Sequence, residues 1–333
     1  MMLEILAPGP LTTVQDAGRS GLRHLGVSSA GAADADALAI ANRLVGNAPG
    51  AAGLEMTLAG PTVQFRDGRF VALTGGECDA HCAGRPVPQW RPVWMPAGAT
   101  LEIKRLRRGA RAYLAVSGGL ATPRVLGSRS TDVRGEFGGR HGRALRSGDR
   151  LKLFAPAPDT APALWRRAAQ SPREWFAAGW WVEPTEDLRG DSALLHVLPG
   201  RHADALDPKT LRMLRDETWT VAKDSDRMGL RFDGPLFQIG NLPEQVSAAV
   251  LPGSLQLPPD GRPILLGVDA QTVGGYPVIA HVIRSDLARA MQLRPGDRVR
   301  AVLVNDDGAA QAWKTRRLML ARMAEGISWR LRM

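Results

Sequence analysis

The amino-acid sequence carries one ordered set of turn signals twice, and this internal repeat constrains the fold more than any other feature. A single shared glycine or proline means little, because these residues mark turns everywhere, but several matches in the same order indicate a duplicated unit. The matching segments are Pro8-Gly9 and Pro199-Gly200, residues 58–65 and 232–239, Gly84-Arg-Pro and Gly261-Arg-Pro, and residues 145–150 and 293–298. The sequence therefore predicts two tandem copies of one unit.

Strand patterns outnumber helical ones along the chain. Short runs rich in Val, Leu and Ile lie between Gly and Pro signals, as in residues 70–74, 112–116 and 264–268, and such runs are typical of strands. Helices are expected only over residues 34–45, after Asp207-Pro208, and over residues 286–291. Many strands with few helices predict a mainly β fold of the barrel type.

The predicted organisation is two β units joined by a linker. The first unit covers residues 1–155, and the second, with a basic C-terminal tail, covers residues 191–333. Residues 156–190 between them begin with a proline-rich stretch that favours an extended linker. The tryptophan-rich part of this segment is predicted to pack as core, with a partner surface as the alternative.

Composition narrows the classes of function. The 333 residues are 44% hydrophobic, and the formal charge is 43 − 33 = +10. Most of the basic residues are arginines spread along the chain, so we expect neither nucleic acid nor a membrane as a partner. The basic tail fits either an acidic partner or a solvated helix face. The N-terminal residues lack a basic and then apolar leader pattern, so we expect a cytoplasmic protein.

Metal and nucleophile chemistry find little support in the sequence. Cys78, His81 and Cys82 lie close together, but no second cluster completes a zinc site, so structural thiols are the preferred interpretation. The sequence contains no nucleophile-elbow serine, no His-Glu-x-x-His pair and no Walker loop. We therefore expect no metal and no cofactor bound by this chain alone.

Residues 269–277 carry more polar chemistry than a structural turn needs. The candidates there are Asp269, Gln271, Thr272, Gly274, Gly275 and Tyr276, and Gln256 lies upstream after a similar turn. Glycines allow main-chain N–H groups to approach a ligand closely. The alternative is a β-hairpin whose turn polar groups are satisfied locally.

Two further loops gather polar side chains. One loop carries Gln15, Asp16 and Arg19, and the other carries Ser128, Arg129, Ser130 and Thr131. The guanidinium groups suit a carboxylate or phosphate. The alternatives are an Asp–Arg ion pair in the first loop and a capping network in the second. We expect these loops and residues 269–277 to converge on one cleft.

Several of these runs together resemble a known family. They are residues 12–21, 109–119, 127–132, 225–229, 252–261 and 269–277. The sequence is similar to the KipA-like family, also called allophanate hydrolase subunit 2 or biotin-dependent carboxyltransferase, whose bacterial members include C subunits of 5-oxoprolinase. The resemblance implies two tandem cyclophilin-like β-barrel units with a few short helices.

The resemblance also implies a function. It points to the C subunit of an ATP-dependent 5-oxoprolinase, a lactam hydrolase that is expected to be inactive without its A subunit or its KipI-like B subunit. Asp16, Asp269 and Gln271 would then be catalytic, and the other polar residues named above would bind substrate. One alternative is the carboxyltransferase subunit of a biotin-dependent carboxylase, which takes carboxybiotin from a partner and acts on a urea-like or amide substrate. A KipA-like regulatory binding module is the other.

Overall fold

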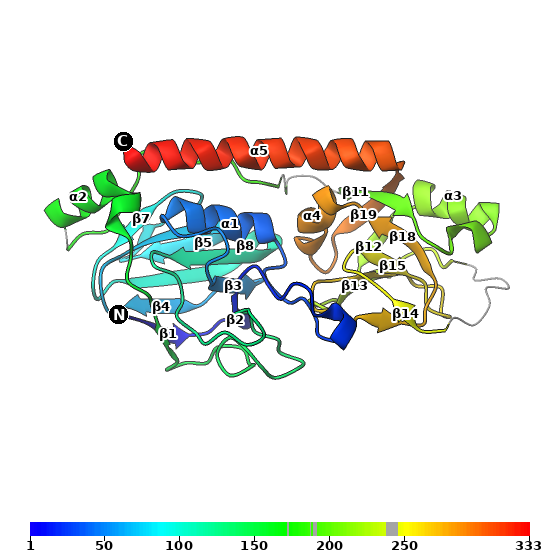
Figure 1. The fold of residues 1–333 in the computed structure, drawn as a ribbon, viewed down its shortest axis with the longest axis horizontal. Coiled ribbons are helices and arrows are strands. Elements are labelled where there is room, and N and C mark those ends of the chain that lie inside the picture. The colour runs from blue at the N-terminus through cyan, green and yellow to red at the C-terminus, as the bar shows by residue number, and fades with distance from the viewer. Residues whose placement is uncertain (172, 187, 189–191, 238–245) are drawn as a thin grey trace. The chain divides into compact units, whose positions relative to one another are not determined.

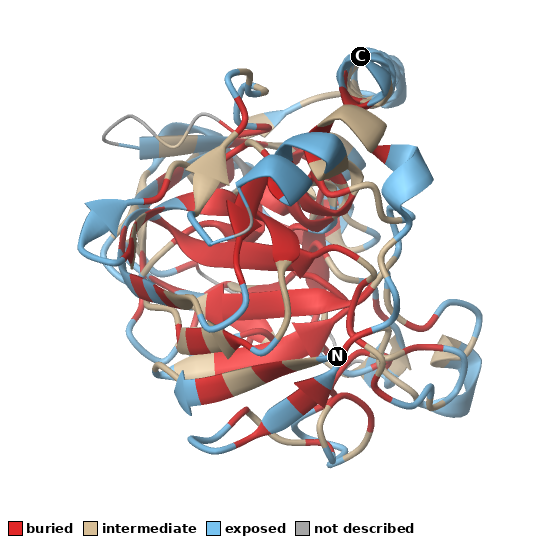
Figure 2. Ribbon diagram, turned by 90° about the vertical axis from the view of Figure 1, so that its left-hand side faces the viewer, coloured by how far each residue is buried: buried red, intermediate tan, exposed pale blue. Residues whose placement is uncertain are grey.

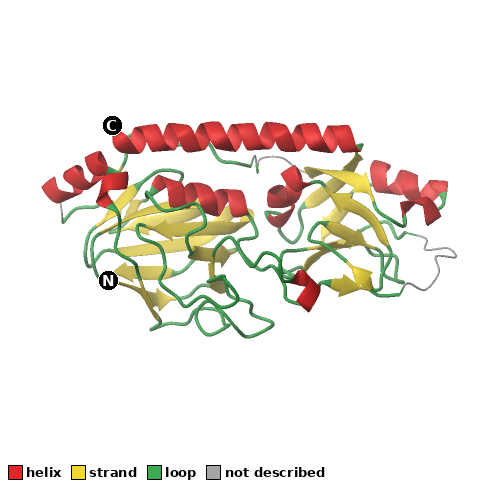
Figure 3. Cartoon of the chain, in the orientation of Figure 1, coloured by secondary structure: helices red, strands yellow, loops and turns green. Residues whose placement is uncertain are grey.

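Strands provide most of the regular structure in both parts of this computed structural model (Figure 3). The structure describes residues 1–171, 173–186, 188, 192–237 and 246–333. The chain divides into unit 1, formed by Met1–Arg19, Ala30–Leu188 and Met319–Met333, and unit 2, formed by Ser20–Ser29 and Arg189–Leu318. The predicted boundary at residues 190 and 191 lies outside the described residues. Residues 156–186 and 188, predicted as a linker segment, belong to unit 1.

Unit 1 is built on a ten-stranded sheet (Figure 1). The strands follow the path β10-β7-β5-β8-β4-β1-β9, with β2, β3 and β6 attached at its sides. Their bounds are β1 Met2–Ala7, β2 Leu11–Gln15, β3 Gly53–Thr57, β4 Thr62–Phe65, β5 Arg69–Cys82, β6 Arg85–Pro86, β7 Val93–Met95, β8 Thr100–Val116, β9 Arg150–Lys152 and β10 Phe176–Ala177. The long strand β8 pairs with β3, β4 and β5, so it is the centre of the sheet.

Burial in unit 1 alternates along β1 and β4, whereas β3, β7 and the first half of β5 are buried on both faces. Figure 2 shows buried bands along the sheet, and one apolar cluster includes Leu3 and Ile5 of β1 together with Leu101 and Ile103 of β8. A second cluster lies under helix α1 (Ala35–Leu44). Asp34 caps this helix, because its carboxylate accepts a hydrogen bond from the main-chain N–H of Ala37 at 3.0 Å. The predicted helix over residues 34–45 is thus confirmed.

The segment after residue 155 is more regular than a linker. It contains a short 3₁₀ turn η2 (Pro158–Thr160) and helix α2 (Pro162–Gln170). Trp165 packs edge-to-face on Phe70 with ring centroids 5.2 Å apart, and Trp175 and Trp180 pack against the apolar clusters. Trp181 is 57% exposed. Aromatic burial therefore attaches most of this segment to unit 1.

Unit 2 is a closed barrel with the strand order β11-β18-β15-β16-β13-β12-β19. Its strands are β11 Ser192–Pro199, β12 Trp219–Val221, β13 Gly229–Asp233, β15 Ser254–Gln256, β16 Ile264–Leu266, β18 Val278–Val282 and β19 Arg298–Leu303. Only β11 and β19 pair in parallel among the described strands. A separate two-stranded ladder joins β14 (Ala248–Ala249) to β17 (Val273–Gly274).

The described part of unit 2 also contains short helical segments. They are η1 (Arg23–Leu25), η3 (Ala203–Ala205), α3 (Pro208–Asp216) and η4 with α4 (Arg284–Asp286 and Leu287–Met291). Asp207 caps α3 by accepting from the N–H groups of Lys209 and Thr210. The predicted helices after Asp207 and over residues 286–291 are therefore present.

The repeated sequence signals adopt the same turn in both units. In unit 1 the N–H of Arg146 donates to the Asp149 carboxylate at 2.8 Å, and in unit 2 the N–H of Arg294 donates to Asp297 at the same distance. The glycine of each turn has positive φ, and each turn leads into a strand, β9 or β19. The duplication read from the sequence thus has a structural counterpart.

The basic C-terminal tail is a 27-residue helix, α5 (Asp306–Arg332), so not every helix is short. Its residues up to Leu318 belong to unit 2, and those from Met319 belong to unit 1. Ile327 and Leu331 are buried in the unit 1 cluster under α1. Among the described residues, no helix has both the length and the apolar character that a membrane span requires.

Candidate functional site

The short ladder of β14 and β17 in unit 2 gathers most of the polar residues predicted near residue 270. Its strands pair Ala248 with Gly274 and Ala249 with Val273. One more hydrogen bond, from the N–H of Val250 to the carbonyl of Thr272 (3.0 Å), extends the ladder. Gln271 is exposed and Thr272 is buried. The ladder thus presents Gln271 to solvent at one end.

Gln256 supports the other end of this ladder from inside. Its side chain is buried, and its amide Nε2 donates weakly to the carbonyl of Tyr276 at 3.4 Å. Gly274 lies directly against it, because a Cβ at residue 274 would stand 2.6 Å from that Nε2. Tyr276 itself is 45% exposed. Gln256 therefore positions the loop that carries Gly274, Gly275 and Tyr276.

Asp269 forms a two-pronged ion pair with Arg227, a partner that the sequence patterns did not indicate. The Nε and Nη2 atoms of Arg227 donate to the two carboxylate oxygens at 2.7 and 2.9 Å, and both side chains are largely buried. Asp226 instead accepts from the N–H groups of Met228 and Gly229 in a tight turn.

The predicted polar cluster of unit 1 is a closed hydrogen-bonded network around Asp16. One carboxylate oxygen accepts from the hydroxyls of Ser128 (2.6 Å) and Ser130 (2.5 Å) and from the N–H of Gly18 (2.8 Å). The other oxygen accepts from the N–H of Arg129 at 2.7 Å. With four donors satisfied and little exposure, this carboxylate holds two loops together, as the capping alternative expects.

Gln15 and Thr131 continue this network into the interior of unit 1. The Gln15 amide nitrogen donates to the carbonyl of Thr131 and the hydroxyl of Thr13, both at 3.1 Å. The Thr131 hydroxyl donates to the carbonyl of Val14 at 3.0 Å. Both residues are fully buried. Their geometry fits structural cross-links between the two loops.

The guanidinium groups of Arg19 and Arg129 both contact other parts of the protein. Arg19 is 2% exposed and donates to the main-chain carbonyls of Val125 and Ser130. Arg129 lies over the ring of Phe154, with 4.9 Å between the guanidinium carbon and the ring centroid. Burial, followed by the nearby charge of Arg124, lowers the pKa of Arg129. Arg19 in particular offers little surface to a ligand.

Sequence patterns missed a buried ionisable network in unit 1. The Glu55 carboxylate accepts from the N–H of Ala33 at 2.8 Å and from the hydroxyl of Tyr113 at 2.9 Å. The Tyr113 oxygen accepts from the N–H of Asp34 at 2.7 Å, and Arg111 lies 3.9 Å from Glu55. Burial, then the charge of Glu55, raises the pKa of Tyr113 well above its usual value. Glu55 stands between Leu54 and Met56 in a strand, so its sequence context carried no hint of this role.

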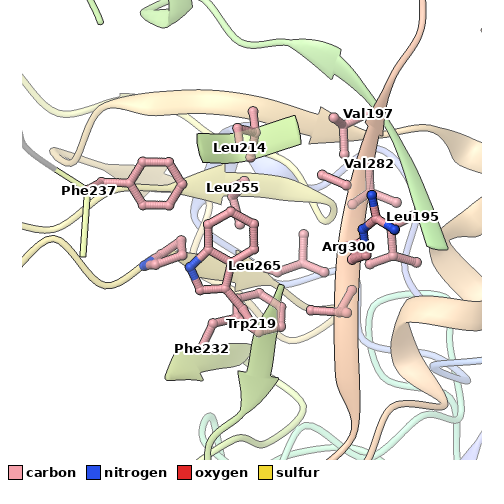
Figure 4. A pocket seen from close by; sticks show the side chains of 13 residues that line it. Leu195, Val197, Leu214, Trp219, Phe232, Phe237, Leu255, Leu265, Val282 and Arg300 are labelled. Carbon is pink, nitrogen blue, oxygen red and sulfur yellow. The ribbon is translucent and has the colours of Figure 1, made fainter. Parts of the chain in front are cut away.

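The barrel of unit 2 contains a small apolar cavity of about 30 Å³ (Figure 4). Leu195, Trp219, Phe232 and Leu265 are among the side chains that line it, and the rings of Trp219 and Phe237 stack 5.2 Å apart. Its apolar walls offer a water molecule few hydrogen-bond partners. We assign this cavity to imperfect core packing. None of its lining residues belongs to the ladder of β14 and β17.

No metal centre is formed by the residues that the structure describes. Cys78 and Cys82 are both buried free thiols. Burial raises the pKa of Cys78 to about 12, with a smaller contribution from Asp79. Such a thiol stays protonated, which fits the structural interpretation.

Comparison with known proteins places the chain in a family. Residues 25–302 match the family described as "Carboxyltransferase domain, subdomain A and B". The chain belongs to this family. The family resemblance and the mainly β fold predicted from the sequence are thereby confirmed.

Three relatives illustrate the range of the similarity. The chain is 37% identical to the C subunit of the 5-oxoprolinase of Escherichia coli over 331 residues, which are 99% of each chain. It is 35% identical to the protein of the same name in Haemophilus influenzae, over 93% of this chain and 94% of that one. The crystal structure of the Kluyveromyces lactis urea amidolyase matches 97% of this chain with a TM-score of 0.84 and 27% identity, but only 20% of that chain is covered.

The predicted site residues therefore fall into two sets, one in each unit. The unit 1 set around Asp16 is mostly buried and hydrogen-bonded within the protein, whereas the unit 2 set at the ladder reaches solvent through Gln271 and Tyr276. Exposed amide and phenol groups beside glycine can bind and orient a small polar molecule. The ladder in unit 2 is thus the stronger candidate for ligand contact.

Proposed function

We propose that this chain is the C subunit of an enzyme complex that hydrolyses 5-oxoproline to glutamate with consumption of ATP. The observation that carries the proposal is the 37% identity to the C subunit of E. coli 5-oxoprolinase across 99% of both chains. A related protein in H. influenzae has the same name and similar coverage. Near full-length similarity supports a shared role in such a complex more strongly than a match to one domain would.

The ladder in unit 2 suits a lactam substrate. A lactam presents a carbonyl acceptor and an N–H donor on adjacent atoms, and the exposed side-chain amide of Gln271 can pair with both at once. Tyr276 and the glycine pair before it offer a hydroxyl and main-chain N–H groups. In this proposal, these residues hold and orient the substrate while Gln256 fixes the loop.

We assign the ATP-dependent activation of the lactam carbonyl to the partner chains, a KipI-like B subunit together with an A subunit. Asp16 and Asp269, named from the sequence as catalytic residues, already accept several hydrogen bonds each. We therefore propose that both are positioning residues and that Gln271 contacts the substrate directly.

The test is co-expression of this chain with its genomic neighbours and purification of the complex. We expect glutamate release from 5-oxoproline only when ATP and all subunits are present. A complex that assembles and yet releases no glutamate with ATP would overturn the proposal. Gln271→Ala should reduce the rate, whereas Gln64→Ala, which changes an amide of unit 1 outside both predicted sets, should not.

A second candidate, carboxyl transfer, is favoured by the family match and by the similarity to the urea amidolyase. In that case a biotinylated partner would deliver the carboxyl group to a urea-like or amide acceptor. A streptavidin blot of the co-purified partners distinguishes the two, because only the carboxyltransferase requires a biotinylated chain. Acceptor-dependent loss of label from a ¹⁴C-carboxylated partner would then support this second activity.

A further inference from the structure

Arg23 lies on a short segment of unit 2 that interrupts unit 1 in the sequence. Residues up to Arg19 and from Ala30 belong to unit 1, but Ser20–Ser29 belong to unit 2. Arg23 begins the 3₁₀ turn η1, which is the dark blue turn beside β14 in Figure 1. The segment thus places a guanidinium next to the ladder that carries Gln271.

The guanidinium of Arg23 is fixed by the ladder. Its Nη2 atom donates to the carbonyl of Val250 at 2.8 Å and to the carbonyl of Gln271 at 3.0 Å. These two acceptors come from the two chain segments that the ladder joins. Both bonds use one nitrogen, so they hold the planar group in place without engaging Nε or Nη1.

The second terminal nitrogen of Arg23 is shielded from solvent and lacks a hydrogen-bond partner within the described part of the chain. A shielded donor without an acceptor is unfavourable, and it calls for an acceptor from outside the described residues, such as a water molecule or a ligand. Burial also lowers the pKa of Arg23.

The charge of Arg23 is not balanced locally. No carboxylate among the described residues forms an ion pair with it, and the acid of the same loop, Asp269, is engaged by Arg227. The exposed groups of that loop, Gln271 and Tyr276, are neutral donors and acceptors. A half-buried cation with an open donor and neutral neighbours is suited to an anion, and a guanidinium matches a carboxylate best.

We propose that Arg23 is the carboxylate-binding residue of the unit 2 site and takes the carboxylate of a small substrate through Nη1. The identity of that acid as 5-oxoproline rests on the proposed function. Sequence patterns gave this role to Arg19 or Arg129, but Arg19 is closed in by the carbonyls of Val125 and Ser130. In Arg23, which is half-buried, Nη1 has no acceptor among the described residues.

Kinetics of the reconstituted complex test the proposal. Loss of a charge-assisted hydrogen bond should raise the KM for 5-oxoproline by roughly 10- to 100-fold in Arg23→Ala and change kcat less. The inhibition constant of 2-pyrrolidinone, which is the same ring without the carboxylate, should stay the same. Equal weakening of both molecules, or an unchanged KM, would overturn the proposal.

Two further variants separate binding from folding. Arg23→Lys keeps the charge and should retain part of the affinity, while Arg262→Ala removes an exposed arginine that pairs with Asp233 elsewhere in unit 2. Near-UV circular dichroism of each complex reports correct folding. The assignment fails if Arg23→Lys is folded and yet binds 5-oxoproline as weakly as an unfolded control. It also fails if Arg262→Ala shows the same KM change as Arg23→Ala.

A direct titration distinguishes failure of this proposal from failure of the proposed function. The full chain, labelled with ¹⁵N-arginine, is titrated with acetate and with 5-oxoproline while the guanidinium signals are followed by NMR. A shift of the Arg23 signal, identified by its absence in Arg23→Lys, supports carboxylate binding even if the complex does not hydrolyse 5-oxoproline. No shift with either probe at millimolar concentration would refute the assignment.

Discussion

The ion pair between Arg227 and Asp269 should be a principal support of the ladder end of unit 2. Both charges are largely removed from water, with side-chain exposures of 6% and 10%, and two hydrogen bonds of 2.7 and 2.9 Å join them. Asp269→Asn keeps the shape and removes the charge. The guanidinium would then remain buried without its counter-charge, which costs about 3–5 kcal/mol when a buried pair is broken from one side.

Two amides beside the pair allow this cost to be measured locally. The N–H of Gly267 donates to the carbonyl of Met228 at 2.8 Å, and the N–H of Asp269 donates to the carbonyl of Arg227 at 3.1 Å. Native-state hydrogen exchange at these amides should accelerate roughly 100-fold or more in Asp269→Asn. The double variant Arg227→Met/Asp269→Leu should recover most of the protection, because a buried pair can be replaced by apolar side chains at little cost.

The control is the exposed pair of Arg262 and Asp233 in the same unit. Their separation is 2.8 Å, but the side chains are 57% and 55% exposed, so its loss should cost at most about 1 kcal/mol. Equal exchange in Asp269→Asn and Asp233→Asn would refute the reasoning from burial. Loss of activity in Asp269→Asn with unchanged exchange would instead favour the catalytic role for Asp269 that the sequence patterns suggested.

Three further predictions follow from single residues. The Arg143 guanidinium lowers the pKa of Asp149 from 3.8 to about 2. The ionised carboxylate therefore stabilises the fold at pH values above the pKa of the unfolded chain, and Asp149→Asn should cost about 1–2 kcal/mol in urea unfolding at pH 7. This difference should vanish as the pH falls from about 4 to 2. The thiol of Cys78 should resist iodoacetamide at pH 8 in the folded chain and react after unfolding, and rapid labelling of the native chain would contradict its burial. Gly274→Ala should displace the side-chain amide of Gln256 and raise the KM of the complex with little loss of stability, whereas Gly179→Ala, which has open space around it, should change neither.

Local signals in the sequence predicted the elements that depend on neighbouring residues. The cap at Asp34 and the repeated turns before residues 150 and 298 each join atoms three residues apart, so composition and spacing predict them. The order of those turns was enough to indicate a duplication. The length of α5 was missed because only Ile327 and Leu331 of that helix are fully buried among its side chains, so its apolar periodicity is weak.

Long-range pairings could not be predicted in the same way. Arg227 and Asp269 are 42 residues apart, and Arg23 is 248 residues from Gln271. Each arginine has 33 acidic side chains and the main-chain carbonyls as possible acceptors. Only the barrel and ladder geometry decides which acceptor is reached. For the same reason, the assignment of Ser20–Ser29 to unit 2 had no signal in the sequence.

The state of the carboxylates bears on what this chain contributes to a reaction. A general base needs a lone pair directed at the substrate, but four donors already bind the Asp16 carboxylate and a guanidinium fork binds that of Asp269. Gln271, in contrast, is exposed, and Nη1 of Arg23 has no acceptor among the described residues. Binding and proton transfer would therefore be divided between different chains of the complex. The isolated chain should bind 5-oxoproline in a titration and yet release no glutamate, and turnover by the purified chain alone would contradict this division.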